Sequence, residues 1–287
     1  MPHFLKIALP ILGLLLLSKS LYALPRSDAV PGGVVTISLG AASAAPQAFY
    51  NNRRVRVTSV EGVWYAEIGL GLSTKPGRGK LVVKDRSGSQ PQSREIAFTI
   101  ADKKYLEQHI TLKDKRKVNP LERDMSRISS EQQRSRTAFN HWQETVAGSS
   151  EFILPVAGPM SSPFGKRRFF NGEARAPHSG IDIAANKGEL VLSPADGVVT
   201  ESGDFFFNGN TLFIDHGQGL VSMICHLDTM KVKSGDQVKR GQPLATVGMT
   251  GRATGPHLHW SVSLNGERVE PTLFLPEQIA KALETAQ

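Results

Sequence analysis

The sequence predicts a mainly β protein, with a small amino-terminal β-sandwich, a connecting α-helix and a larger carboxy-terminal antiparallel β domain. Three observations support this fold class. Short runs of β-branched and apolar residues recur along most of the chain. Turn sequences rich in Gly, Pro and Asn separate these runs. One polar, densely charged stretch in the middle has helical spacing instead.

The first 23 residues have the pattern of an export signal. Lys6 supplies a positive start, residues 7–17 are almost continuously apolar, and Ala23 precedes the expected cleavage site. The apolar run is about half of the ~20 residues that a membrane-spanning helix needs. We therefore expect residues 1–23 to be a signal peptide, with no stable transmembrane anchor, and the mature chain to begin near Leu24.

Residues 24–112 are expected to form a small Ig-like β-sandwich. Turn signals such as Pro31-Gly32-Gly33 and Asn51-Asn52 punctuate a series of short strand-like runs. The predicted strands are residues 34–39, 55–60, 63–72, 80–84 and 95–100. No cluster of catalytic residue types occurs in this module, so we expect it to have a packing role.

Residues 113–150 are predicted to be a charged helical linker. Asn119, Pro120 and Glu122 fit the N-cap, N1 and N3 positions of a helix. Apolar residues at helical spacing lie near the two ends of the stretch, whereas residues 129–136 are wholly polar. These apolar residues are Met125, Ile128, Phe139, Trp142 and Val146. Gly148 is the expected stop, and the charged middle is typical of a solvated face.

Strand patterns and tight turns return in residues 151–276, which are predicted to form one antiparallel β domain. The expected strands lie around Val191 and at residues 198–200, 211–215, 220–226, 244–247 and 257–264. Residues 277–287 follow as a tail that forms a short helix or frays.

Four of the eight histidines lie in strand-like, Gly-flanked segments of this domain. Alternation places His178 and Asp182 on one face of a strand, with Gly180 between them leaving room for both side chains to converge. The same alternation places His257 and His259 on one face. Two histidines and one carboxylate make a three-ligand zinc set that keeps a fourth position for water or substrate. Taken alone, each pair is a weak signal, and two strand histidines without a function would be commoner than a functional pair.

His226 ends another predicted strand and adds a further imidazole. The chain lacks an HExxH motif, so neighbouring histidines would have to accept the proton of the attacking water. Cys225, the single cysteine, excludes both an intramolecular disulfide and thiolate-rich structural zinc sites. Alternation places it on the face opposite His226, as a buried and inert thiol. His109 and His141 have no companions.

The formal net charge of +8 favours polyanions in general. The sequence contains no nucleic-acid-binding module, zinc-finger spacing or aromatic ladder, so no nucleic-acid partner is expected.

The phrases around the histidines resemble the lysostaphin-type (LytM-like) M23 zinc metallopeptidases. The resemblance covers about residues 154–275, and the upstream region resembles, more loosely, the amino-terminal module of exported members. The matching phrases, in order, are Ser162-Pro163-Phe164-Gly165, His178-Ser179-Gly180-Ile181-Asp182-Ile183-Ala184, Ala195-Asp196-Gly197-Val198-Val199, Asp215-His216-Gly217, His226-Leu227, Val238-Lys239-Arg240-Gly241-Gln242, Gly248-Met249-Thr250-Gly251 and Thr254-Gly255-Pro256-His257-Leu258-His259.

The resemblance implies one Zn²⁺ per chain, held by His178, Asp182 and His259. It implies that His226 and His257 flank the reacting water as catalytic residues. It also implies an endopeptidase that cleaves stem or cross-bridge peptides of bacterial peptidoglycan, exported to the periplasm or envelope of a Gram-negative cell.

The alternative is a non-enzymatic or latent murein-binding regulator of another hydrolase, with an envelope protein as partner. The complete ligand set argues against the non-enzymatic form. For the latent form, we expect residues 119–148 or the amino-terminal module to pack near the groove and restrict access.

Overall fold

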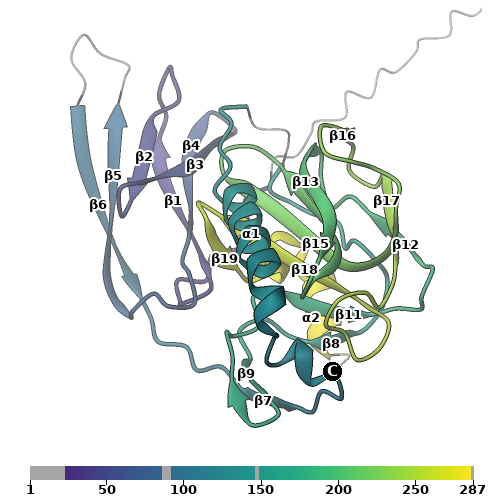
Figure 1. The fold of residues 1–287 in the computed structure, drawn as a ribbon. Coiled ribbons are helices and arrows are strands. Elements are labelled where there is room, and N and C mark those ends of the chain that lie inside the picture. Colours follow the sequence, from purple (N-terminus) through teal and green to yellow (C-terminus); the bar gives the residue numbers. More distant parts are fainter. Residues whose placement is uncertain (1–22, 86–91, 146–148, 286–287) are drawn as a thin grey trace, which may run out of the picture.

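The computed structural model describes residues 23–85, 92–145 and 149–285, and it contains two β domains joined by one long helix (Figure 1). The predicted fold class, mainly β with a connecting helix, is confirmed. Nearly all of the predicted signal peptide lies outside the described residues. Within the described part of the chain, neither helix combines the length and the apolar character needed to cross a bilayer.

The amino-terminal module contains six antiparallel strands in the order β1-β4-β3-β2-β5-β6. They are β1 (Val34–Gly40), β2 (Gln47–Tyr50), β3 (Arg53–Val60), β4 (Val63–Gly69), β5 (Gly77–Asp85) and β6 (Gln92–Ile100). Apolar side chains from all six strands contribute to one hydrophobic cluster, so the two halves of the sheet share a core. The sequence missed only β2, which is short and is joined to β3 by the left-handed pair Asn51 and Asn52.

The segment that connects the two β domains, called the linker from here on, begins with β7 (Glu107–Ile110), upstream of the predicted boundary at residue 113. It contains the short 3-10 helix η1 (Lys115–Lys117) and continues into α1 (Glu122–Phe139). The predicted helix start at Asn119 is wrong. Leu121 is the N-cap residue, and its backbone N–H donates to the Asp124 carboxylate. The side-chain oxygen of Asn119, the atom that would cap a helix, instead accepts from Arg175, and its amide donates to Glu173 on a neighbouring strand.

The helix also ends earlier than its apolar spacing indicates. Asn140 is the C-cap of α1, so Trp142 lies beyond the helix, where the guanidinium of Arg54 stacks on its ring. Val146 and Gly148 lie outside the described residues. Phe139 closes the helix by packing edge-on against Phe213 of the larger domain, at a ring-centroid distance of 5.1 Å.

The carboxy-terminal domain is built on a ten-stranded antiparallel sheet whose main path runs β16-β13-β14-β15-β18-β11-β8. Its strands are β8 (Met160–Ser162), β11 (Ile181–Ala184), β12 (Leu190–Leu192), β13 (Gly197–Phe205), β14 (Gly209–Asp215), β15 (Leu220–Met230), β16 (Gln237–Val238), β17 (Pro243–Val247), β18 (His257–Leu264) and β19 (Glu267–Val269). A 3-10 helix η2 (Pro271–Phe274) and α2 (Glu277–Thr285) follow; Ala280 and Leu283 of α2 belong to the main hydrophobic core.

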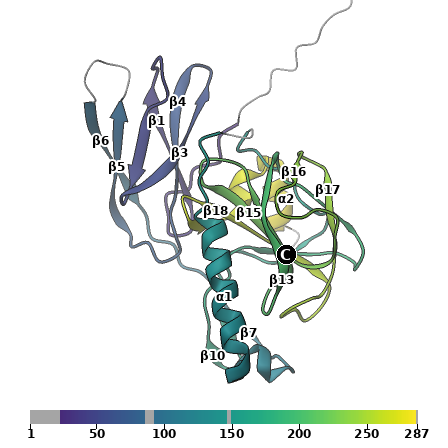
Figure 2. The same ribbon diagram turned by 45° about the horizontal axis from the view of Figure 1, so that its top comes forward.

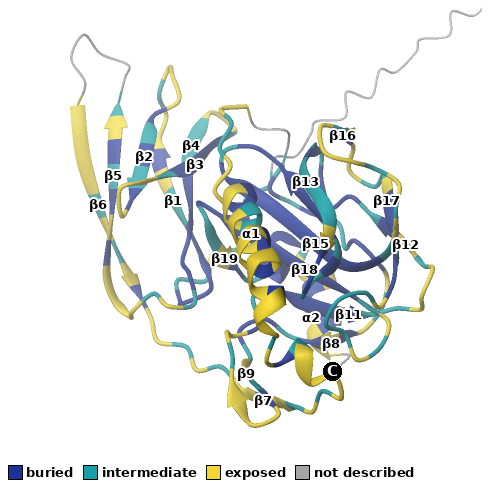
Figure 3. Ribbon diagram, viewed as in Figure 1, coloured by how far each residue is buried: buried dark blue, intermediate teal, exposed yellow. Residues whose placement is uncertain are grey.

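A second, three-stranded sheet joins the linker to this domain. The linker strand β7 pairs in parallel with β9 (Arg167–Phe170), which pairs with β10 (Glu173–Ala174). Figure 2 shows β7 and β10 at the foot of α1. The helix turns its buried residues toward the domain and its exposed residues toward solvent (Figure 3). The linker therefore contacts the domain through both a strand and a helix.

The two β domains meet through buried polar groups. Arg56 forms an ion pair with Glu67 (Nε–Oε2 3.4 Å), and both side chains are fully buried. Arg56 also donates to the carbonyl of Gly217, and Ser150 donates to Glu67. The module is thus fixed against the larger domain by a charge-balanced cluster.

Candidate metal centre

Two adjacent strands bring the first site residues together. β11 and β18 are antiparallel, and Asp182 pairs directly with His259. Gly180 lies where the chain enters β11, and a Cβ at this position would come within 2.4 Å of the Trp260 carbonyl. A residue without a side chain is therefore needed here to bring His178 over the strand pair.

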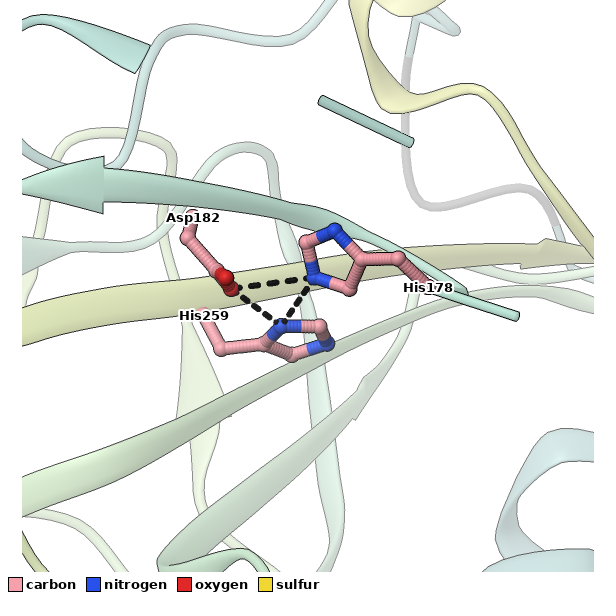
Figure 4. A group of neighbouring side chains, drawn as sticks. All are labelled: His178, Asp182 and His259. Carbon is pink, nitrogen blue, oxygen red and sulfur yellow. Dashed lines mark hydrogen bonds and ion pairs between the residues drawn. The ribbon is translucent and has the colours of Figure 1, made fainter. Parts of the chain in front are cut away.

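Three ligand atoms of His178, Asp182 and His259 converge at one point (Figure 4). The Nε2 atom of His178 lies 3.0 Å from Asp182 Oδ1 and 3.1 Å from His259 Nδ1. His259 Nδ1 lies 2.7 Å from the same Asp182 oxygen. Zinc bonds of about 2.0–2.1 Å in a tetrahedral site separate ligand atoms by roughly 3.3 Å. The three atoms match a zinc site after a small outward movement.

Each candidate ligand is held by a second partner. His178 Nδ1 lies 2.8 Å from the Pro163 carbonyl, which can only accept, so Nδ1 carries the proton and Nε2 presents its lone pair. His259 Nε2 contacts Ser261 Oγ at 2.8 Å, which directs Nδ1 to the centre. Asp182 Oδ2 accepts from Arg168 Nη2 at 2.8 Å, which leaves Oδ1 for the centre.

Burial and hydrogen bonding set the charges of the site. Burial lowers the pKa of His178 to about 4, so the ring is neutral near pH 7. Burial alone would raise the pKa of Asp182, but its close contacts with His178 and His259 hold that pKa well below its usual range. A neutral Nε2 and an ionised oxygen, both acceptors, thus lie 3.0 Å apart. Such a donor-poor pair fits a cation.

Arg168 is a site residue that the sequence did not predict. It lies on β9, and its side chain bridges Asp182 and Gln108 of the linker strand β7 (Nε–Oε1 3.3 Å). The metal centre is therefore connected to the linker through one guanidinium group. Its position in the segment between Gly165 and His178 gave no motif from which the contact could be predicted.

His226 and His257 lie beside these three residues. Their ring centroids are 4.8 Å apart, and His257 Nε2 is 3.9 Å from Asp182 Oδ1. Each Nδ1 lies 2.8 Å from a backbone carbonyl, that of Thr250 for His226 and that of Gly255 for His257. Both rings therefore carry the proton on Nδ1 and keep Nε2 as an acceptor. Burial, followed by the neighbouring His257 and His259, lowers the pKa of His226 to about 3.

The backbone explains how His226 reaches the site. It adopts a left-handed conformation (φ +63°) inside β15, where the register with β14 also shifts. This bulge interrupts the alternation of the strand. Cys225 pairs with His259 and lines the same cavity, so the predicted placement of the thiol on the opposite face is wrong. The thiol is buried, and burial raises its pKa well above the ordinary value.

Two further histidines have structural partners. His216 is buried and makes contacts from both nitrogens, to the Asp196 carbonyl at 2.7 Å and to Ser222 Oγ at 2.9 Å. The prediction that His141 has no companion is wrong, because its Nδ1 lies 2.7 Å from the buried carboxylate of Asp215. This contact ties the chain after α1 to β14.

A cavity of about 500 Å³ opens beside the metal centre. The five site residues line one part of it, and residues of α1, including Ile128, Ser135 and Phe139, line another. No residue of β1 to β6 lies among the described lining residues. The helical region thus packs near the groove, as expected, whereas the amino-terminal sheet does not. That this restricts access stays a prediction.

Comparisons with known proteins agree with this geometry. The sequence model of Peptidase family M23 matches residues 176–271, and that of the Peptidase family M23 N-terminal domain matches residues 27–103. A crystal structure from Pseudomonas aeruginosa, assigned to peptidase M23, is 41% identical, has a TM-score of 0.73, and matches over 86% of this chain and 95% of its own.

Two curated relatives are similar over the carboxy-terminal domain. The peptidoglycan DD-endopeptidase ShyC of Vibrio cholerae is 40% identical over 132 residues, which are 44% of this chain and 30% of the relative. The DD-carboxypeptidase/endopeptidase Mpg of Neisseria meningitidis is 40% identical over 133 residues, 45% of this chain and 31% of the relative. This chain therefore spans about a third of the length of either relative.

Proposed function

Because the chain belongs to peptidase family M23, we propose that it is a zinc-dependent endopeptidase that cleaves peptide bonds in bacterial peptidoglycan. One Zn²⁺ per chain would bind His178 Nε2, Asp182 Oδ1 and His259 Nδ1. The observation that carries the proposal is the convergence of these three atoms within 3.1 Å of one another. The complete set favours an enzyme over a non-enzymatic regulator, since a regulator has no need of it.

His226 and His257 are proposed to be the catalytic histidines. A bound zinc ion supplies Lewis acidity for peptide hydrolysis. Burial lowers the pKa of His226 and keeps this ring neutral near pH 7, so its Nε2 lone pair can accept a hydrogen bond from the reacting water. The carbonyls of Thr250 and Gly255 fix the tautomer of both rings, with Nε2 as the acceptor.

The names of the relatives indicate which peptidoglycan bond is cleaved and suggest the cellular compartment. ShyC and Mpg both act as DD-peptidases by name, so we propose that this enzyme cuts the D,D cross-link of the stem peptides in a Gram-negative envelope, after export directed by residues 1–23. We also propose that residues 24–112, 113–150 and 151–276 form the module, linker and peptidase domain. Mass spectrometry of muropeptides after digestion identifies the bond, and a cut within an uncross-linked stem would contradict the proposed specificity.

Metal analysis combined with activity tests the residue roles. EDTA should abolish murein cleavage, and added zinc should restore it. His178→Ala and Asp182→Ala should lose bound zinc together with activity. His226→Ala and His257→Ala should retain zinc but cleave about 10²- to 10⁴-fold more slowly, as expected for loss of a proton-transfer group. Zinc loss in both of the latter variants would make these histidines ligands instead.

A further inference from the structure

The cavity beside the metal centre contains positive charge that has no acidic partner among the described residues. The two carboxylates that line it are already engaged: Glu131 accepts from Arg127 and from the Phe206 backbone, and Asp182 accepts from Arg168. Arg252 also lines the cavity, yet no carboxylate of the described chain lies within 4 Å of its guanidinium. The part of the cavity at Arg252, unlike the metal centre, is therefore complementary to an anion.

Two aromatic rings hold the Arg252 guanidinium in place. Its central carbon lies 4.5 Å from the ring centroid of Phe170 and 4.6 Å from that of Phe207. Within the part of the chain that the structure describes, the one polar contact of the side chain is a long hydrogen bond from Nη1 to the Lys117 carbonyl, at 3.4 Å. A guanidinium has five N–H donors, so most of this hydrogen-bonding capacity remains for a ligand.

Arg252 lies between the groups that support the catalytic histidines. The carbonyl of Thr250, two residues before it, accepts from His226, and that of Gly255, three residues after it, accepts from His257. On its other side, Phe170 is two residues from Arg168 on β9, and residues at this spacing share a strand face. A ligand atom on Arg252 would thus lie in the same cavity as the reacting groups.

The electrostatic environment supports the same conclusion. Burial, reinforced by the positive charges of Arg168 and Arg175, lowers the pKa of Arg252 to about 10. The group is still protonated near pH 7, but its positive charge is poorly solvated and repelled by its neighbours. Binding of an anion would relieve both effects.

We propose that Arg252 binds a free carboxylate of the peptide substrate, so that the enzyme prefers acidic peptides that present a carboxylate near the scissile bond. The planar fork of a guanidinium matches a carboxylate in a two-pronged hydrogen-bonded pair. This inference rests on the proposed peptidase function. The carboxylate is either the carboxyl terminus of the peptide or an internal carboxylate of the stem.

Kinetics with selectively amidated peptides distinguish these sources. The probes are synthetic cross-linked stem peptides with all carboxylates free, with only the terminus amidated, with only the internal carboxylates amidated, or with all of them amidated. In the wild type, amidation of the recognised carboxylate should lower kcat/KM about 10- to 100-fold, mainly through KM, as for loss of a charged hydrogen bond. Arg252→Ala should lower cleavage of the free peptide similarly and abolish the discrimination.

Arg252→Lys and Arg240→Ala complete the design. The lysine variant keeps the charge but loses the fork, so it should be intermediate. Arg240 is exposed and lies outside the cavity, so Arg240→Ala controls for the change in net charge. If Arg252→Ala lowered kcat/KM equally for the free and the fully amidated peptides, the proposal would be overturned. A residue that only holds β9 in position affects all substrates alike.

A binding measurement separates this inference from the proposed function. The same peptides are titrated calorimetrically into zinc-loaded His257→Ala and into its double variant with Arg252→Ala. The free peptide should bind about 10- to 100-fold more weakly to the double variant, whereas the fully amidated peptide should bind both equally. If the wild type cleaves none of the peptides, the proposed function fails, and this titration still decides whether Arg252 binds a carboxylate.

Discussion

The molecule buries two clusters of ionisable side chains, one at the metal centre and one between the two β domains. At the domain interface, Arg56 faces Glu67, and the remaining contacts pair N–H or O–H donors with oxygen acceptors. At the metal centre, a neutral imidazole nitrogen and an ionised carboxylate oxygen, both acceptors, converge with His259. The interface is complete within the chain, whereas the centre is complementary to a cation.

This difference separates a structural from a functional buried cluster. Buried charges are costly unless they are paired, so a mutually satisfied cluster indicates a role in fixing two parts of the fold. A cluster in which hydrogen-bond acceptors face one another without a donor between them indicates a binding site for a cation. Variants of the interface should therefore change stability without changing zinc affinity, and variants around the centre should do the reverse.

The largest effect is expected for Glu67→Ala at the interface. Removing the carboxylate breaks the buried ion pair of Arg56, which should lower the free energy of unfolding by about 3–5 kcal/mol. Zinc affinity should not change. Denaturant unfolding and a competitive chelator titration measure the two quantities.

Glu95→Ala is the matched control, because Glu95 pairs with Lys80 at 2.9 Å but is exposed. Its loss should cost no more than about 1 kcal/mol. The contrast between the two clusters would be contradicted if Glu67→Ala lowered the free energy of unfolding as little as Glu95→Ala does, or if it weakened zinc binding. Should Glu67→Ala fail to fold, Glu67→Gln removes the charge while keeping the side-chain shape and one of the two acceptor oxygens that serve Thr58 and Ser150.

The next largest effect is expected for Arg168→Ala, which removes the partner of Asp182 Oδ2. Loss of a group that orients a metal ligand typically weakens metal binding about 10- to 100-fold. Arg167→Ala is the control, because Arg167 is the next residue on the same strand but is exposed and pairs with Glu107 at 3.0 Å. Equal zinc affinities for the two variants would show that Asp182 needs no support from β9.

More of the site than of its surroundings could be predicted from the sequence. Alternation correctly places Leu258 and Trp260 in the core and the two histidines of β18 on the other face, because a regular strand has period two. His178 precedes β11 but still reaches Asp182 through the room left at Gly180. These are local relations between neighbouring residues, which a sequence records directly.

The features that were missed depend on contacts between distant segments. The left-handed backbone of His226 interrupts the alternation of side chains along β15, from which the position of Cys225 was predicted. The start of α1 is displaced from Asn119, whose side-chain oxygen accepts from Arg175, 56 residues away in the chain. Arg168 and Arg252 have roles only once β9 lies against β7 and against the loop that precedes β18. Pairings of this kind are set by the tertiary fold.

The smallest effect is a change in the pH dependence of stability from His216, whose backbone carbonyl contacts Arg56 at the interface. Burial, with a contribution from Arg56, lowers its pKa from 6.5 to about 4 in the folded protein. Between these values the unfolded chain binds a proton that the folded protein does not. His216 should therefore cost stability as pH falls from about 6.5 to about 4, by about 1.4 kcal/mol per pH unit. Above pH 6.5 it should contribute no slope.

Urea unfolding at several pH values measures this slope as the difference between the wild type and His216→Gln, in which contributions from the other histidines cancel. His109→Gln is the control, because His109 lies exposed on β7. The variant of His216 should be less stable at neutral pH, because it loses a buried ring with two contacts, but its stability should fall less steeply on acidification.

If the free energy of unfolding of the variant had the same slope against pH as that of the wild type, His216 would not be a neutral group buried at the interface. The pH sensitivity would then belong to the metal centre, and the contrast between the two clusters would be weaker than the hydrogen bonds of His216 indicate.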